Sequence, residues 1–233
     1  PAIEFNRPGI ETQLPGHVEQ VAAAVEKARA ATPKPGNLER LEAHLVNDQF
    51  FLEQKRGVRH TLADLTFVDS LVIRLGDREI RVLNRGPAVT PGDAFLVLPT
   101  ERIVVTGDLL INPISFALSS YPSGWLATLE AIDALGAAIL VPGHGQPLRD
   151  ETLLHAHIAL FRKLLEHGRS AKGRGLDLAA AKAEILPSLA DLRATITGGD
   201  TSQDQAFDLY LVEWYLSRVY QELDGPLGDA IRP

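Results

Sequence analysis

The chain has 233 residues, of which 45% are hydrophobic and 23% are charged, and its net charge is −7. This composition is typical of a folded globular protein and excludes a largely disordered chain. The sequence has neither a basic cluster nor an apolar run of about 18 residues, which argues against a nucleic-acid partner and against insertion in a membrane.

The chain contains no cysteine and no methionine, and it begins at Pro1. Without cysteine, neither disulfides nor thiolate metal ligands are available. The lack of methionine suggests a processed, truncated or incomplete chain. The N-terminus shows no signal-peptide pattern, and without cysteine the redox compartment cannot be inferred. We expect a soluble protein of the cytoplasm or, if a signal peptide was removed, of the periplasm.

Two helices are predicted in the first quarter of the chain. The first runs from His17 to about Ala31 and carries valines and alanines on one face. The Pro- and Gly-rich residues 32–37 form a break, and a second helix follows over residues 38–56. Each helix is expected to bury one apolar stripe.

The pattern changes to strand-like alternation near residue 65. Every second position is apolar in residues 71–75 and again in residues 80–83, on either side of a Gly76-Asp77 turn. This pattern predicts a hairpin with one buried face. The next predicted elements are strands over residues 95–98 and 103–106, a helix with Ser123 as its N-cap, and a strand over residues 139–141. This β-β-β-β-α-β order is typical of a layered α/β sheet covered by at least one helix.

From Asp150 onward the chain is predicted to be helical. The expected helices cover residues 150–170, 176–185, 188–196 and 200–223. The last carries aromatic residues at helical spacing between Phe207 and Tyr220, and a helix docked on the core explains them better than a cofactor-binding face. Gly173 to Gly175 is the best domain boundary, dividing a sheet domain of residues 1–172 from a helical extension of residues 173–233.

Two glycine-marked turns carry potential metal ligands. Asp108 ends the segment Val104-Val105-Thr106-Gly107-Asp108, and His144 lies within Pro142-Gly143-His144-Gly145 after another apolar run. Short β-branched runs that glycine stops predict buried strands, which deliver a side chain to a sheet edge. Asp and His are ordinary zinc ligands, but a catalytic zinc usually has about three protein ligands. A turn aspartate and a surface-loop histidine remain alternative explanations.

In order and spacing, three segments together resemble the metallo-β-lactamase fold superfamily: Gly86-Pro87-Ala88-Val89-Thr90-Pro91-Gly92-Asp93, Thr106-Gly107-Asp108 and Pro142-Gly143-His144-Gly145. The resemblance covers residues 65–150. It implies an αββα sandwich with one or two metal ions at the sheet edges, usually zinc and in some members iron or manganese. By this resemblance Asp108 bridges two metals, His144 ligates the second, and both are catalytic.

The resemblance also implies a hydrolase acting on a small molecule. A metal-bound hydroxide would attack an ester, lactone, thioester or amide carbonyl, and Asp93 would orient the site with Thr90 beside it. The loop after Asp108 resembles a branch with an Asn-Pro loop and a Tyr-Pro step. The polar residues that we expect near the substrate are Asn112, Ser115, Ser119 and Tyr121. Ordinary loop capping explains each of these four equally well.

Two features depart from the family pattern. Val89 stands where the family usually has a histidine ligand, and the leading His-x-His-x-Asp-His motif is absent from this sequence. The sole His-x-His, at residues 155–157, is predicted to lie on a solvated helix surface. Residues 1–64 then correspond to the helical connection that follows the leading motif, so we expect an N-terminally incomplete sandwich.

The missing ligands leave two other interpretations open. The chain could be a non-catalytic or truncated member that acts as a binding or scaffold protein. It could also form a homo-dimer, because a sandwich without its first strands exposes sheet edges and core surface.

Overall fold

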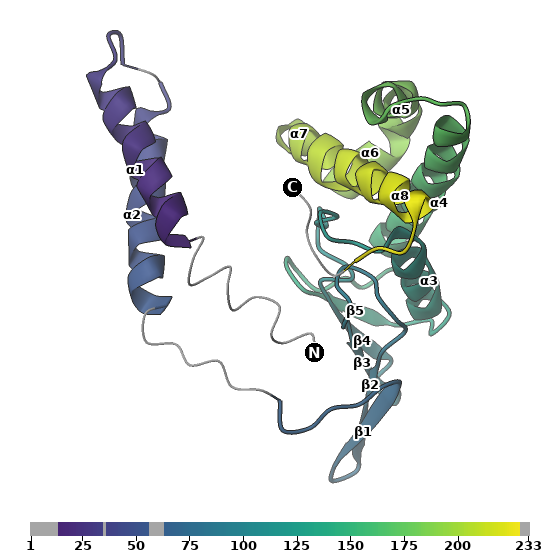
Figure 1. The fold of residues 1–233 in the computed structure, drawn as a ribbon. Coiled ribbons are helices and arrows are strands. Elements are labelled where there is room, and N and C mark those ends of the chain that lie inside the picture. Colours follow the sequence, from purple (N-terminus) through teal and green to yellow (C-terminus); the bar gives the residue numbers. More distant parts are fainter. Residues whose placement is uncertain (1–13, 35, 56–62, 229–233) are drawn as a thin grey trace. The chain divides into compact units, whose positions relative to one another are not determined.

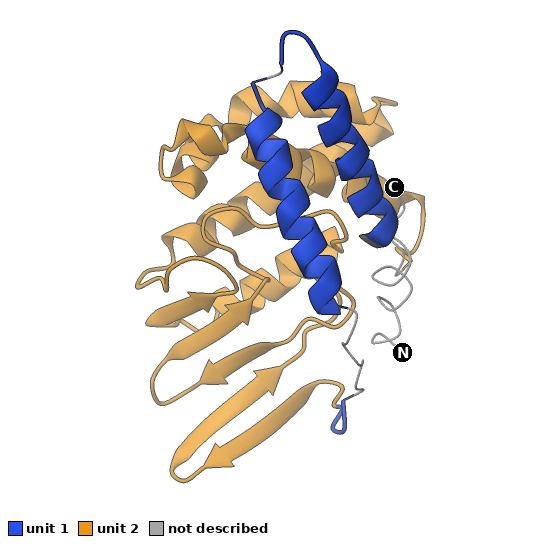
Figure 2. Cartoon of the chain, turned by 90° about the vertical axis from the view of Figure 1, so that its left-hand side faces the viewer, with its two compact units in different colours: residues 1–66 blue, residues 67–233 orange. Residues whose placement is uncertain are grey.

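The computed structural model describes residues 14–34, 36–55 and 63–228. The chain divides into two compact units, residues 1–66 and 67–233 (Figure 2). The predicted boundary between residues 172 and 173 falls inside the second unit, and that division stays a prediction. None of the helices in the described ranges is long and apolar enough to cross a membrane.

The first unit is a pair of helices packed side by side (Figures 1 and 2). Helix α1 covers Leu14–Ala30 and helix α2 covers Leu38–Lys55, close to the predicted bounds. Val18, Val25 and Ala28 of α1 are buried, but α2 has no buried residue, so the expected burial of its apolar stripe is wrong. The Pro- and Gly-rich break separates the two helices as expected, because proline cannot continue a helix.

The second unit is built on one five-stranded sheet in the order β1-β2-β3-β4-β5. The strands are β1 (Ser70–Leu75), β2 (Arg78–Leu83), β3 (Phe95–Leu98), β4 (Ile103–Gly107) and β5 (Ile139–Pro142). The first four pair antiparallel, whereas β5 lies parallel to β4. A parallel pair needs a crossover, and helix α3 (Pro122–Asp133) supplies it. The predicted strand and helix order is confirmed.

One face of the sheet forms the core. Buried and half-buried residues alternate along β3, β4 and β5, so that Phe95, Val104 and Leu140 point to the same side. They belong to one buried cluster with Trp125 and Leu129 of α3. This alternation is what a half-covered sheet requires, and it fixes the register of the two parallel strands.

The C-terminal part of the second unit is helical (Figure 1). Its elements are α4 (Thr152–Gly173), α5 (Leu178–Ile185), η3 (Leu186–Leu189), α6 (Ala190–Thr197), η4 (Thr201–Gln203), α7 (Asp204–Ala206), the π-helical η5 (Phe207–Glu213) and α8 (Trp214–Asp224). Phe207, Leu211, Tyr215 and Val219 are fully buried. The aromatic stripe therefore docks on the core, as the sequence indicated.

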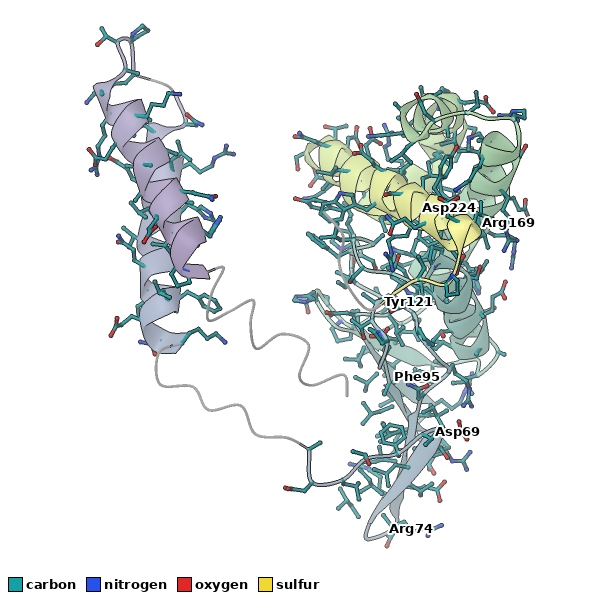
Figure 3. The ribbon with its side chains drawn as sticks, in the orientation of Figure 1. Asp69, Arg74, Phe95, Tyr121, Arg169 and Asp224 are labelled. Atoms are coloured by element: carbon teal, nitrogen blue, oxygen red, sulfur yellow. The ribbon has the colours of Figure 1, made fainter. Side chains whose placement is uncertain are left out.

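The hairpin β1–β2 forms as predicted, but its predicted buried face is wrong. Ile73 is 38% exposed and Leu75 is 63% exposed, and no residue of β1 is buried. Strand β1 is the outermost strand of the sheet, and no residue of β1 or β2 belongs to the buried cluster. Figure 3 shows Asp69 and Arg74 at this end of the unit, away from the helices.

The start of α3 also differs from the prediction. Tyr121 occupies the N-cap position and Pro122 is the first helical residue, so Ser123 lies inside the first turn. Proline favours the first helical position because its missing N–H has no helical partner there. The Ser123 hydroxyl instead donates to Oε2 of Glu222 in α8 at 2.8 Å, which ties the two helices together.

Candidate metal centre

The two predicted metal ligands lie at the same edge of the sheet. Because β4 and β5 are parallel, their carboxyl ends meet at one edge. Asp108 follows the end of β4 directly, and His144 is the second residue after the end of β5. Nε2 of His144 lies 3.5 Å from Oδ1 of Asp108. Their side chains are 70% and 56% exposed, so both are accessible from solvent.

Gly143 makes this approach possible. Its N–H donates to the carbonyl oxygens of Gly107 at 2.9 Å and Leu110 at 3.1 Å. A Cβ atom at this position would collide with Oδ1 of Asp108 and would lie 2.8 Å from the Asp108 nitrogen. Only glycine lets the two loops come this close.

Asn112 holds the two loops together. Its N–H donates to the His144 carbonyl at 3.1 Å, and its Nδ2 donates to the Gln146 carbonyl at 3.3 Å. Gly145 has a φ of +86°, and a Cβ there would collide with the Asn112 carbonyl oxygen. Asn112 was predicted to lie near the substrate, and in the structure its amide connects the Asp108 and His144 loops.

Thr106 is a site residue that sequence reasoning missed. It is fully buried, and its hydroxyl lies 3.3 Å from the Val141 carbonyl and 3.1 Å from the Gly107 carbonyl. The hydroxyl thereby joins β4 to β5 just before each strand ends. The available signal was a polar residue at an inward-facing strand position, directly before Gly-Asp.

Ser115 and His157 form a buried polar chain behind the Asp108 loop. The Ile111 N–H donates to the Ser115 hydroxyl at 3.1 Å, and that hydroxyl lies 3.4 Å from Nε2 of His157. Nδ1 of His157 lies 2.9 Å from the Leu153 carbonyl, an acceptor only, so Nδ1 carries the proton. His157 is fully buried, which corrects its predicted position on a solvated helix surface; His155 is exposed as expected.

Burial lowers the pKa of His157 from 6.5 to about 4, and the hydrogen bond to Leu153 opposes this only in part. Between pH 6.5 and 4 the unfolded chain therefore binds a proton that the folded protein excludes, so stability falls as the pH falls. We expect the metal-free protein to lose about 3 kcal/mol more across this window than a His157→Gln variant. Urea unfolding in chelator at several pH values measures the difference. Parallel pH profiles for the two proteins would contradict it.

Asp93 stabilises the turn that carries Val89. Its carboxylate accepts the Thr90 N–H at 2.6 Å and the Thr90 hydroxyl at 2.9 Å. Burial raises the pKa of Asp93, and these hydrogen bonds oppose the rise. Val89 itself is buried and its carbonyl accepts the Ser119 hydroxyl at 3.2 Å. This turn therefore contributes backbone order and no ligand at position 89.

Tyr121 lies between the sheet and α8 (Figure 3). Its N–H donates to the Ala88 carbonyl at 2.6 Å, and the guanidinium of Arg218 lies 5.6 Å from its ring centre. Nε of Arg218 donates to the Ser120 carbonyl at 2.6 Å, so α8 holds the end of the Asp108 loop.

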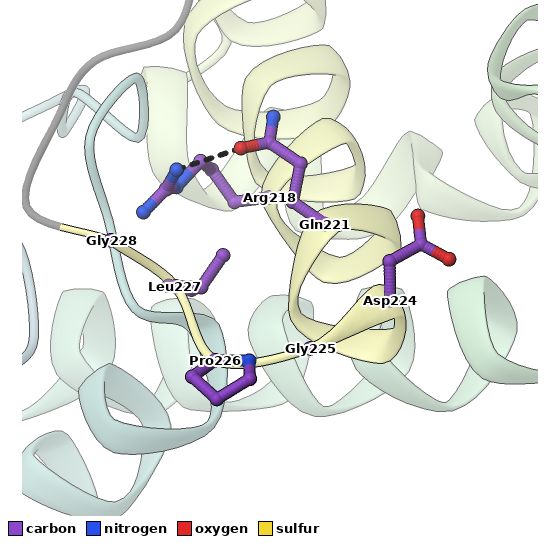
Figure 4. Close-up of a pocket in the computed structure, with 7 residues that line it drawn as sticks. All are labelled: Arg218, Gln221, Asp224, Gly225, Pro226, Leu227 and Gly228. Carbon is purple, nitrogen blue, oxygen red and sulfur yellow. Dashed lines mark hydrogen bonds between the residues drawn. The ribbon is translucent and has the colours of Figure 1, made fainter.

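A cavity of about 240 Å³ lies beside Arg218 (Figure 4). Its walls are Arg218, Gln221, Asp224 and residues 225–228, and Nη1 of Arg218 donates to Gln221 at 2.8 Å. Neither Asp108 nor His144 lines this cavity. It is separate from the candidate metal centre.

A sequence model of the metallo-beta-lactamase superfamily matches residues 16–144, which is more than half of the chain. The chain belongs to the metallo-β-lactamase superfamily. Members of this superfamily are usually metal-dependent and hydrolytic, and the predicted α/β fold class is confirmed. No curated protein is significantly similar in sequence.

Two solved structures of a sulfatase have a similar fold over most of this chain. The sec-alkylsulfatase Pisa1 from Pseudomonas sp. is 17% identical with a TM-score of 0.51, over 69% of this chain and 26% of that chain. A double mutant of the same sulfatase gives a TM-score of 0.55 at 17% identity, over 71% and 27% of the two chains. A metallo-beta-lactamase family protein from Thermus thermophilus is 18% identical over 76% of this chain and 56% of that chain, with a TM-score of 0.45. This chain thus spans about a quarter of the sulfatase.

The geometry of Asp108 and His144 fits two ligands of one metallo-β-lactamase metal ion. Ligand atoms around a tetrahedral zinc are about 3.3–3.5 Å apart, since each bond is near 2.0–2.2 Å. Their 3.5 Å separation matches this, whereas the His155–Asp133 pair on another surface is hydrogen-bonded at 2.6 Å. Within the described ranges no third His, Asp or Glu completes a ligand group with them.

Proposed function

We propose that this metallo-β-lactamase superfamily member is a metal-dependent hydrolase of a small molecule that carries an ester, lactone, thioester or amide carbonyl. The observation that carries the proposal is the accessible Asp108–His144 pair, held at ligand spacing by two glycine turns. Family membership supports a hydrolytic and metal-dependent activity over a purely structural role.

In this proposal Asp108 and His144 hold the ion through Oδ1 and Nε2. Their mixed oxygen and nitrogen set suits zinc, and iron or manganese accept the same donors. When bound, the metal supplies Lewis acidity that activates water and polarises the carbonyl. The residues around the pair position it: Gly143 allows the contact, Asn112 joins the loops, and Asp93 stabilises the neighbouring turn. A complete set needs about one further ligand.

A substrate panel tests this function. The metal-loaded full chain is assayed with nitrophenyl esters, thioesters, lactones and β-lactams, and with a secondary alkyl sulfate because one structure of similar fold is a sec-alkylsulfatase. We expect one carbonyl class to be hydrolysed, with the rate abolished by chelator and lowered at least about 100-fold in Asp108→Asn, as for other lost catalytic groups.

Asp133→Asn is the matched control, because Asp133 also forms an exposed pair with a histidine. It should keep the wild-type rate. Absence of hydrolysis in the metal-loaded protein would contradict the proposal, and so would an Asp108→Asn variant as fast as wild type.

A further inference from the structure

A second group of potential metal ligands lies in the helix pair of the first unit. His17 of α1 and His44 and Asp48 of α2 place one ligand atom each within 4.8 Å of one another. His44 and Asp48 are four residues apart and so share one face of α2. Asp108 and His144 belong to the second unit.

Asp48 occupies a position where the packing of the two helices calls for an apolar side chain. The half-buried residues Leu41, Leu45, Asp48 and Leu52 follow one another at spacings of four, three and four. Such spacing forms the stripe of α2 that packs on a partner helix. The Asp48 side chain is only 18% exposed, in contrast to both histidines, whose side chains are more than half exposed.

The carboxylate of Asp48 lacks the partners that such a position requires. Its Oδ2 is buried and accepts no hydrogen bond from any residue in the described part of the chain. A buried charge is costly unless a cation or hydrogen-bond donors compensate it. Among the described residues, the ionic partners within 4 Å of Oδ2 are the two histidine rings.

The distances fit ligands of a shared ion better than direct pairing. Nε2 of His17 lies 3.4 Å from Oδ2 of Asp48, and Nε2 of His44 lies 3.3 Å from the same oxygen. Neither contact has the geometry of a hydrogen bond, unlike His155 with Asp133 at 2.6 Å. Ligands of one tetrahedral ion stand about 3.3–3.5 Å apart. The two rings meet edge to face, with centres 6.1 Å apart.

We propose that the α1–α2 helix pair binds a zinc-type divalent ion through Nε2 of His17, Nε2 of His44 and Oδ2 of Asp48, with solvent as the fourth ligand. Two imidazoles and one carboxylate are a common zinc set. The ion joins the first turns of α1 to the middle of α2 and compensates the buried carboxylate. Its role is to stabilise the helix pair, because an ion that binds only the folded state adds stability.

Zinc titration of the full chain tests the proposal. The Asp108→Ala/His144→Ala double variant removes the candidate metal centre from the count, and both side chains are exposed enough to be truncated without loss of packing. After chelator treatment, we expect this protein to bind about one equivalent of zinc in equilibrium dialysis. Adding His17→Ala, His44→Ala or Asp48→Asn should weaken zinc binding at least about 100-fold.

Two further variants separate a ligand role from a packing role. Asp48→Leu should abolish zinc binding while it raises the melting temperature of the zinc-free protein, because leucine completes the apolar stripe. His155→Ala, which disrupts the Asp133–Glu151–His155 group, should leave zinc binding unchanged. The proposal is overturned if the double variant binds no zinc, or if Asp48→Leu binds zinc as tightly as its parent.

Discussion

Gly143→Ala is expected to lower the metal affinity of the Asp108–His144 pair by about 10–100-fold. This is the usual effect of losing a group that positions metal ligands. The added methyl group collides with Oδ1 of Asp108 and lies 2.7 Å from the Gly107 carbonyl carbon. Because the methyl group collides with the backbone as well as with the Asp108 side chain, the two loops must move apart. Titration of the chelator-treated protein with zinc or cobalt measures the affinity.

Gly92→Ala is the matched control for this substitution. Gly92 also lies in a loop next to a predicted site residue, but a Cβ there meets nothing within 4 Å. Its metal affinity should equal that of the wild type. If Gly143→Ala binds metal as tightly as Gly92→Ala, the ion does not depend on the close approach of the two loops.

Trp125→Ala is expected to lower the free energy of unfolding by about 3–5 kcal/mol, the usual cost of truncating a buried Trp. Trp125 is fully buried, and the centre of its ring lies 4.5 Å from the centre of the Phe161 ring. Its indole N–H donates to the Leu109 carbonyl at 2.9 Å, directly after Asp108. The substitution therefore creates a cavity and leaves a buried carbonyl unpaired. Denaturant unfolding of the metal-free protein measures the loss.

Trp214 provides the comparison. It is partly buried and packs against Phe116, which is 46% exposed. Trp214→Ala should cost clearly less than Trp125→Ala, because solvent already reaches this aromatic group. Equal losses of unfolding free energy in the two variants would show that Trp125 does not anchor the core. So would a Trp125→Ala protein whose free energy of unfolding lies within about 1 kcal/mol of the wild type.

The order of elements and the two site loops could be predicted because both depend on local pattern. The apolar runs before Gly107 and Gly143 alternate in the structure as buried strands, and glycine ends each one. Since these strands are parallel, Asp108 and His144 must meet at one edge. The geometry thus follows from the strand direction, which the intervening helix determines.

Other features depend on partners that are distant in the sequence. The hairpin β1–β2 alternates correctly, but its burial depends on whether another layer covers the outermost strand. The burial of His157 depends on the loop containing Ser115, 42 residues earlier. Ser123 bonds to Glu222, 99 residues later, instead of capping its own helix. Periodicity alone carries no information about such contacts.

The candidate site was predicted only in part for the same reason. The glycine turns identified Asp108 and His144, but they could not show that Thr106 and Asn112 would connect the two loops. Those connections use hydroxyl and amide groups that often have purely local partners in loops. Val89 is buried, in agreement with its inability to act as a ligand.

Metal analysis of the purified full chain tests the central claim most directly. The protein is expressed with added zinc, iron or manganese, and its metal content is compared with that of Asp108→Ala and His144→Ala. We expect each variant to contain about one equivalent less than the wild type, while Asp133→Ala matches the wild type. Wild-type metal content in both the Asp108 and the His144 variants would contradict a metal centre at this edge of the sheet.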